Sequence, residues 1–336
     1  MRVNASLISG LESVPSRIRA IEAAGYDGAF SAEISSDPFL PLLLAAEHSE
    51  RVRLMTAISV AFARNPMTVA GLAHDLNQYS GGRFHLGLGS QIEPHIRKRF
   101  SMPWSKPAAR MREFVLALQA IWSCWLDGTP LDFRGEFYTH TLMTPMFTPA
   151  RRDFERPAVH VAAVGPRMTE VAGEVADGLI VHGFTTEKYL REVTLPAVER
   201  GLARAGRARA DFDISAPVIA ISGMDDEAVE KGRQLVKMQL AFYASTPAYK
   251  PVLDLHGWGE LQPTLNRLSK QGGWQEMGEL ISEEILEAFA VVCEDPADLA
   301  HGFAERFGGL IDTWQCTVDL PDPDAQGELL RSVREL

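Results

Sequence analysis

The clearest structural signal in the chain lies in residues 158–183, which read AVHVAAVGPRMTEVAGEVADGLIVHG. A short apolar run, interrupted only by His160, ends at Gly165-Pro166. Apolar residues then recur at helical spacing as far as Asp177-Gly178, and a second apolar run follows at once. The pattern predicts a strand, a tight turn, a helix and a second buried strand.

The turn at Gly165-Pro166 is a candidate anion site. Where a strand feeds a helix through such a turn, free backbone N–H groups and the helix dipole both favour an anion. Pro166 suits the first helical position because no N–H is needed there, and Arg167 adds a positive charge. A Gly-Pro pair is also an economical way to enter a helix, so both interpretations stay open at this point.

Length and composition indicate a soluble globular protein, which we take as a single domain over residues 1–336. Hydrophobic residues make up 46% and charged residues 23% of the chain. The formal net charge of −11 argues against nucleic-acid binding, which needs a basic face. No signal peptide or membrane span is predicted. The 3 cysteines are far apart and match neither a disulfide framework nor a metal motif, which favours a reducing cytoplasm.

Strand-like and helix-like segments alternate along the chain. This alternation predicts a (β/α)8 TIM barrel with insertions at about 90–157 and 245–290, after the fourth and seventh strands. A doubly wound sheet is the rival, but its only signal, Gly87-Leu88-Gly89, lacks a third glycine and a following helix. The polar tail from residue 321 is expected to be peripheral. The expected strands are residues 3–8, 27–33, 52–58, 83–88, 159–164, 179–181, 212–222 and 310–317. The expected helices are residues 14–24, 38–48, 66–79, 108–126, 166–176, 186–204 and 225–243, with one more starting at Asp295-Pro296.

In such a barrel the active site lies at the carboxyl ends of the strands. Glu33 closes the second strand and either points into a pocket or lies on the surface just beyond it. His95, in the loop after the fourth strand, is either a proton donor or an ordinary loop histidine. The other expected strand ends are Ile8-Ser9, residues 57–59, residues 89–91, residues 163–165 and His182-Gly183.

The remaining chemistry-bearing residues are few. His160 lies inside a strand, where a satisfied core histidine is the simpler interpretation, and His182 is a weaker candidate than Glu33 or His95. Neither a metal-binding H-x-H or H-E-x-x-H spacing nor a G-x-S-x-G elbow occurs. A phosphate turn with so few acid–base groups suggests that a cofactor carries the chemistry.

Several segments resemble the luciferase-like monooxygenase superfamily. SGGRFHLGLG at residues 80–89 is similar to its fourth-strand signature, and RNPMTVA at residues 64–70 to the segment before it. Residues 162–178 resemble its fifth and sixth strands, and GEFY at residues 135–138 its hairpin. The resemblance covers nearly the whole chain in order, and it is greatest to the branch that uses the deazaflavin coenzyme F420 rather than FMN.

The resemblance implies a set of site residues. The third strand of the family carries a non-prolyl cis peptide against the flavin ring, and this position matches Ala57-Ile58. Glu33 and His95 match cofactor-contacting positions, and both are also the catalytic candidates. The turn that approaches the cofactor's side chain and phosphate matches Ala163, Val164, Gly165 and Arg167. The catalytic histidine and glutamate of the sugar-phosphate dehydrogenase members are replaced by Ile34 and, nearby, Ile92, which argues against glucose-6-phosphate oxidation.

The resemblance also implies a function. The first hypothesis is an F420-dependent oxidoreductase that transfers a hydride between the deazaflavin C5 and a small, fairly apolar substrate. The alternatives are an FMN-dependent monooxygenase that uses reduced flavin and oxygen, and a non-catalytic flavin-binding protein. A cytoplasmic homodimer, served by a reductase that supplies reduced cofactor, is the implied setting. The sequence leaves the substrate, the direction of hydride transfer and the proton-transfer residue open.

Overall fold

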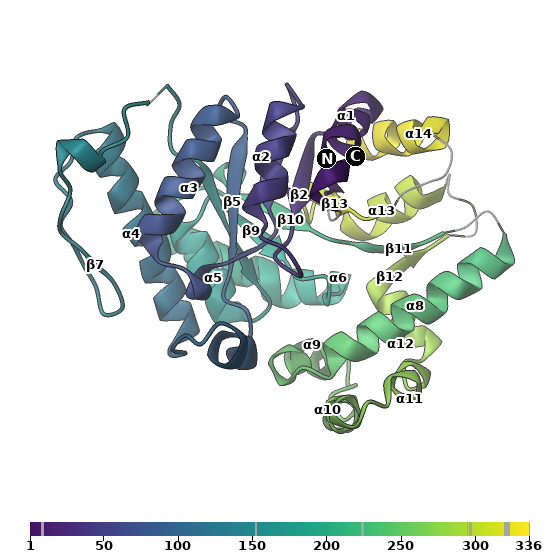
Figure 1. Cartoon of the computed structure of the whole chain (residues 1–336). Coiled ribbons are helices and arrows are strands. Elements are labelled where there is room, and N and C mark those ends of the chain that lie inside the picture. Colours follow the sequence, from purple (N-terminus) through teal and green to yellow (C-terminus); the bar gives the residue numbers. More distant parts are fainter. Residues whose placement is uncertain are drawn as a thin grey trace.

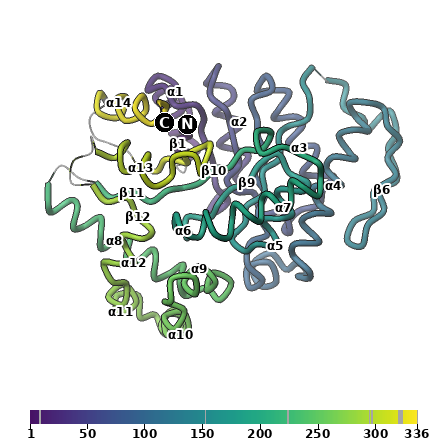
Figure 2. Tube along the Cα trace, turned by 180° about the vertical axis from the view of Figure 1, so that it is seen from behind, coloured from purple at the N-terminus to yellow at the C-terminus, as the bar shows by residue number. Residues whose placement is uncertain are grey.

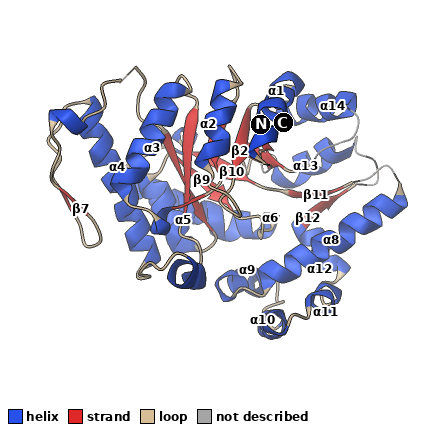
Figure 3. Ribbon diagram, viewed as in Figure 1, coloured by secondary structure: helices blue, strands red, loops and turns tan. Residues whose placement is uncertain are grey.

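Parallel strands close into the expected barrel. In the computed structural model, which describes residues 1–7, 10–151, 153–222, 225–293, 295, 298–318 and 323–335, the closed barrel has 8 strands. The ring is completed where β1 pairs with β13 and β3 pairs with β5. Figure 3 shows the strands enclosed by helices. The barrel strands are β1 (Arg2–Ser6), β2 (Gly28–Ser31), β3 (Arg53–Thr56), β5 (Phe84–Gly89), β8 (Ala158–Ala163), β9 (Gly178–Val181), β10 (Asp213–Ala216) and β13 (Thr313–Cys316). The (β/α)8 prediction is confirmed.

Capping residues set the helix boundaries that the sequence predicted. The first helix ends at Gly25, whose φ of 88° is readily adopted only by glycine. The third begins at Asn65, whose side chain accepts a hydrogen bond from Met67 N, and Pro66 occupies its first position. The helices around the barrel are α1 (Val14–Ala24), α2 (Phe39–Glu47), α3 (Pro66–Tyr79), α4 (Pro107–Leu126), α5 (Pro166–Val175), α6 (Glu187–Tyr189), α7 (Leu195–Ala205), α13 (Leu299–Phe307) and α14 (Pro323–Arg334).

Helix α4 is part of the barrel wall although it lies within the expected insertion at 90–157. It packs between α3 and α5. Its Trp122 is fully buried and donates a hydrogen bond from Nε1 to the Ala70 carbonyl, 3.1 Å away. What projects from the wall after α4 is a short antiparallel hairpin of β6 (Phe133–Arg134) and β7 (Thr139–His140).

A second core forms beside the barrel. The helix expected over 225–243 is α8 (Asp226–Ala244), and it packs on the helices that follow it rather than on the barrel strands. The helices that contact α8 are α10 (Leu261–Gln271), α11 (Trp274–Glu279) and α12 (Glu283–Phe289), and α9 (Lys250–Leu255) packs on α10. Figure 1 shows α8 to α12 as a group of helices at one side of the barrel. The second core therefore starts before the expected boundary at residue 245. Helix α13 packs on the barrel instead, with the Phe303 ring 4.1 Å from that of Trp314 on β13.

The expected seventh strand, 212–222, is two strands. Its first part is β10 in the barrel, and its second part, β11 (Ile219–Ile221), pairs outside it with β12 (Ala290–Val292). Pro217 lies between them, and proline has no N–H to donate to a strand ladder. The break leads the chain out of the barrel and into the second core.

The C-terminal tail is a barrel helix, not a peripheral segment. In α14 the side chains of Leu329, Leu330 and Val333 are buried. The Met1 ammonium donates to the Arg334 carbonyl at 3.2 Å, and Figure 2 shows the two chain ends side by side. Residues that the sequence placed at a strand end or a segment start, namely Ile8, Ser9, Pro296 and residue 321, lie outside the described residues. Within the described part of the chain, no helix has the length and apolarity to span a bilayer.

Candidate active site

We call the end of the barrel where the carboxyl ends of the strands meet the mouth. An apolar floor lines the barrel interior at this end. Phe30 on β2, Met55 on β3 and Ile180 on β9 form a buried cluster of their own. The partly buried side chains of Ala57, Ile58 and Ala162 pack against it. At the mouth, Ala57, Ile58 and Ala162 thus keep part of their apolar surface accessible above this buried cluster.

The chain bulges at the end of β3, where the peptide bond between Ala57 and Ile58 is cis, as the resemblance implied. Backbone hydrogen bonds to the segment after β2 hold this bulge. Ala57 N donates to Ser31 O at 2.7 Å, and Glu33 N donates to Ile58 O at 3.0 Å.

The Glu33 carboxylate holds the segment that follows the bulge through hydrogen bonds. Its side chain is only 7% exposed, and Oε2 accepts hydrogen bonds from Val60 N at 2.8 Å and from Arg64 at 2.5 Å. Arg64 also binds Asp37 at 3.0 Å. Because Oε2 is committed to these donors, the structure shows Glu33 as a residue that positions the chain after Ile58. The cofactor contact expected for Glu33 stays a prediction.

Two glycines on β5 make room for the bulge. A Cβ at Gly87 would collide with the Thr56 carbonyl oxygen, and one at Gly89 would lie 2.7 Å from Ile58 Cδ1. The Thr56 hydroxyl also bonds to both N and O of Gly87, each at 2.8 Å. The glycine pair, which lies within β5, is therefore a packing requirement of this mouth.

The β8–α5 turn has the features of an anion site. Gly165 is the N-cap residue of α5 and makes no side-chain cap, and Pro166 follows it. A Cβ added to Gly165 would meet no atom within 4 Å, so the space beside the turn is open. Ala163 is buried and Val164 half-buried just before the turn, whereas Arg167 is exposed and forms no ion pair within the described residues.

His95 lies apart from these residues. It begins a π-helical turn, His95–Arg99, and its side chain is exposed. In the described residues no contact joins its ring to Glu33 or to the apolar floor. The structure thus brings together the ends of β2, β3 and β8, whereas His95 is exposed in the loop after β5.

His182, which the sequence ranked low, is the histidine at the mouth. It follows β9 two residues after Ile180, so the alternation of side chains places both on the inner face of the barrel. His182 Nδ1 accepts a hydrogen bond from Phe184 N at 2.9 Å, and Nε2 lies 3.3 Å from the Tyr249 hydroxyl. Burial lowers the pKa of His182 to about 4, so its ring is neutral at pH 7.

Aromatic rings of the second core surround His182. Its ring lies 4.9 Å from that of Tyr243 on α8 and 4.6 Å from that of Tyr249, while Phe184 stacks on Phe289 at 4.5 Å. Burial, with a smaller effect of Tyr243, raises the pKa of Tyr249 to about 12. The position of His182 at a strand end was visible in the sequence, but its partners Tyr243 and Tyr249 lie more than 60 residues further along the chain.

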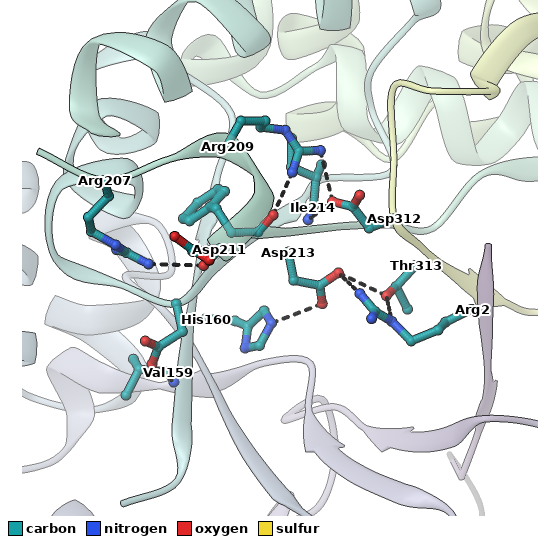
Figure 4. A network of polar contacts seen from close by, with 12 residues as sticks. Arg2, Val159, His160, Arg207, Arg209, Asp211, Asp213, Ile214, Asp312 and Thr313 are labelled. Carbon is teal, nitrogen blue, oxygen red and sulfur yellow. Dashed lines mark hydrogen bonds and ion pairs between the residues drawn. The ribbon is translucent and has the colours of Figure 1, made fainter. Parts of the chain in front are cut away.

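The amino end of the barrel holds a different set of polar residues (Figure 4). Asp213 accepts hydrogen bonds from Arg2 at 2.6 Å and Thr313 at 3.0 Å, and lies 3.1 Å from His160 Nε2. Burial alone would raise the pKa of Asp213, but the bond to His160, aided by Arg2, holds it well below its usual range. Burial, with the neighbouring His160, also lowers the pKa of His85 well below its usual range. His160 is thus a core residue, as expected, and this network serves the fold.

The mouth fits a flavin-type cofactor, which combines an apolar ring system with an anionic side chain. The floor around Phe30, Met55 and Ile180 suits the ring, and the open N-terminus of α5 suits a phosphate. Ser59, directly after the bulge, is fully buried, and its hydroxyl has no hydrogen-bond partner within the described residues. Across the same residues no group of three or more His, Cys, Asp or Glu side chains is arranged to hold a metal ion.

Comparison with known proteins gives the same assignment. The model of the luciferase-like monooxygenase family matches residues 4–313. An uncharacterized protein of Mycobacterium tuberculosis is 53% identical over 93% of this chain and 92% of its own length. A 5,10-methylenetetrahydromethanopterin reductase of Archaeoglobus fulgidus is 24% identical over 84% of this chain and 85% of its own length.

Solved structures share the fold. The coenzyme F420-dependent tetrahydromethanopterin reductase of Methanopyrus kandleri superposes with a TM-score of 0.79 at 21% identity, covering 99% of this chain and 98% of its own. The oxygenating constituent of 3,6-diketocamphane monooxygenase of Pseudomonas putida, in complex with FMN, gives 0.67 at 16% identity, covering 99% and 96%. With its barrel, its mouth and a family match over most of its length, the chain belongs to the luciferase-like monooxygenase family.

Proposed function

We propose that this protein is an F420-dependent oxidoreductase acting on a small, fairly apolar substrate. The observation that carries the proposal is the pairing, at one end of the barrel, of an apolar floor with an open helix N-terminus. The similarity to a putative coenzyme F420-dependent oxidoreductase of Mycobacterium tuberculosis, 27% identical over 82% of this chain, favours F420 over FMN.

Different residues of this chain would bind the ring system and the phosphate of the cofactor. Ala57 and Ile58 support one face of the ring system, and the backbone N–H groups after Gly165 bind the phosphate, with Arg167 adding charge. Ala163 and Val164 line the approach to that turn. The carboxylate of Glu33 keeps the bulge in place through Val60 and Arg64.

A bound deazaflavin would supply the carbon, C5, that exchanges a hydride with the substrate. The protein contributes position and an environment from which water is excluded by the apolar floor. Of the two catalytic candidates, we keep His95 as a contact from the outer loop and Glu33 as a positioning residue. We further propose that the enzyme acts in the cytoplasm as a homodimer, with a separate reductase that supplies reduced cofactor.

FMN is the second candidate cofactor, because a solved monooxygenase of the same fold is in complex with FMN. Both cofactors present a ring system and a phosphate, so the floor and the α5 N-terminus suit either. FMN would make the protein a monooxygenase that uses reduced flavin and oxygen.

Titration of the purified protein with F420 and with FMN, followed by tryptophan quenching, tests the proposal. We expect tighter binding of F420, and hydride exchange seen as a change in F420 absorbance with a panel of apolar substrates. Tighter binding of FMN with oxygen consumption would establish the monooxygenase instead. Binding without any turnover would favour a flavin-binding protein, and binding of neither cofactor would contradict all three functions.

A further inference from the structure

The hydrogen bonds of His182 at the mouth determine which of its ring nitrogens accepts and which donates. Phe184 N carries a hydrogen, so His182 Nδ1 must act as the acceptor in their 2.9 Å bond. In a neutral imidazole the other nitrogen then carries the proton. His182 Nε2 therefore donates to the hydroxyl oxygen of Tyr249, 3.3 Å away.

Because His182 donates to Tyr249, the hydrogen of the Tyr249 hydroxyl is available for another acceptor. The oxygen already accepts from His182, and none of the described residues supplies an acceptor for the hydroxyl hydrogen. Tyr249 is half-buried, between the mouth and the second core. The Tyr249 hydroxyl thus accepts from His182 and carries a hydrogen for which the described residues supply no acceptor.

The surroundings of this donor are apolar and uncharged. The rings of Phe184 and Tyr243 lie 6.1 Å from Tyr249 and 4.9 Å from His182, respectively. Lys250, which follows Tyr249, pairs with Asp254 at 2.5 Å, and Lys188, which follows His182 in the chain, donates to the Leu255 carbonyl at 3.1 Å. Such a site would favour a neutral acceptor and disfavour a carboxylate, which would lose its hydration without gaining a counter-charge.

We propose that Tyr249 donates a hydrogen bond to a neutral acceptor oxygen, such as a carbonyl, on an apolar or aromatic substrate, and that His182 is the positioning residue that fixes this donor. The proposal rests on the proposed function only in taking the mouth as the reacting site. It narrows the substrate class from any small apolar compound to one that carries an uncharged acceptor oxygen next to an apolar group.

Three probes of nearly equal size test the proposal: acetophenone, ethylbenzene and benzoate. Their binding is measured by ligand-observed NMR titration with the full-length protein, as purified and again with F420 added. The wild type should bind acetophenone more tightly than the other two. Tyr249→Phe should weaken acetophenone binding about 3- to 10-fold and leave ethylbenzene within about 2-fold, since only a neutral hydrogen bond is lost.

Control variants separate this role from a general loss of structure. Tyr79→Phe removes a hydroxyl from an exposed tyrosine on α3 and should change nothing. His182→Leu should lose the preference for acetophenone, whereas His182→Gln, whose amide can still donate to Tyr249, should retain part of it. This rescue keeps the test valid if Tyr249→Phe fails to fold.

Other outcomes would overturn the proposal. They are tighter binding of benzoate, an unchanged preference in Tyr249→Phe or in His182→Leu, and binding of none of the probes up to their solubility limits. Because these measurements do not require F420 to bind, the proposal and the cofactor assignment can fail separately.

Discussion

The two ends of the barrel use polar groups in opposite ways. At the amino end, Asp213 joins Arg2, Thr313 and His160 in a network whose members bind one another. At the mouth the interior is apolar, and two kinds of donor, the N–H groups at the N-terminus of α5 and the hydroxyl hydrogen of Tyr249, have no acceptor among the described residues. The polar groups at the amino end therefore stabilise the fold, whereas the donors at the mouth are available to ligands.

The largest effect is expected at the bulge that forms the mouth. Gly87→Ala should cost at least about 4 kcal/mol of folding stability or prevent folding, because its Cβ would collide with the backbone at Thr56. Gly71→Ala is the matched control, since a Cβ at that helical glycine meets nothing within 4 Å. That control should stabilise α3 by about 0.5–1 kcal/mol. Urea denaturation measures both variants, and equal stabilities would refute the role given to Gly87.

At the amino end, Asp213→Asn should destabilise the protein by about 3 kcal/mol while leaving cofactor affinity unchanged, because it disturbs a buried network far from the mouth. Asp132→Asn, in a pair that is 66% and 68% exposed, should cost less than about 1 kcal/mol. A loss of cofactor binding in folded Asp213→Asn would contradict the separation between the two ends.

The same variant should also change the response to acid. The folded-state pKa of Asp213 lies below its unfolded value, so the stability it contributes is present above about pH 4 and is lost as the pH falls below that. The difference in unfolding free energy between wild type and Asp213→Asn should therefore narrow as the pH is lowered from 7 to 3. A constant difference would mean that the carboxylate does not act through its charge.

Glu33→Gln tests whether a paired carboxylate at the mouth affects both stability and ligand binding, because Glu33 lies at the ligand-binding end. Loss of its charge-assisted bond to Arg64 should cost about 1–2 kcal/mol and weaken cofactor binding, since the bulge is less firmly held. Glu93→Gln, in a surface pair that is about half exposed, is the control and should change neither property. Full stability with a loss of turnover alone would instead identify Glu33 as a catalytic group.

The smallest effect is expected from Arg167→Ala. This exposed side chain should add only about 1 kcal/mol to cofactor binding, so the affinity should fall several-fold and depend less on salt concentration. Arg267→Ala, which removes an equally charged exposed residue from α10, controls for the change in net charge. Unchanged affinity and salt dependence would place the phosphate away from Arg167.

Local patterns in the sequence were enough to predict the barrel. Periodicity and capping gave the boundaries of α1 and α3, and the resemblance located the cis bond at Ala57-Ile58. Local patterns do not show what a helix packs against. The second insertion was therefore expected to begin at about residue 245, although the apolar face of α8 already belongs to the second core. The tail was judged peripheral because its composition is polar, yet a few leucine and valine side chains bury one face of α14.

The site was harder to predict, because its contacts join distant segments. A glutamate at the end of a strand suggests a ligand, and nothing local shows that Arg64 and Val60 already bind Glu33. His182 was ranked below His95 since its partner, Tyr249, lies in the second core. Whether the cofactor residues act as the resemblance implies stays a prediction.

A crystal structure of the protein with F420 tests the central claim most directly. The account predicts the deazaflavin ring against Ile58 and the floor of Phe30, Met55 and Ile180, with the phosphate at the N-terminus of α5 beside Gly165. A cofactor bound anywhere else, or a ring turned away from Ile58 with its phosphate remote from Gly165, would contradict it.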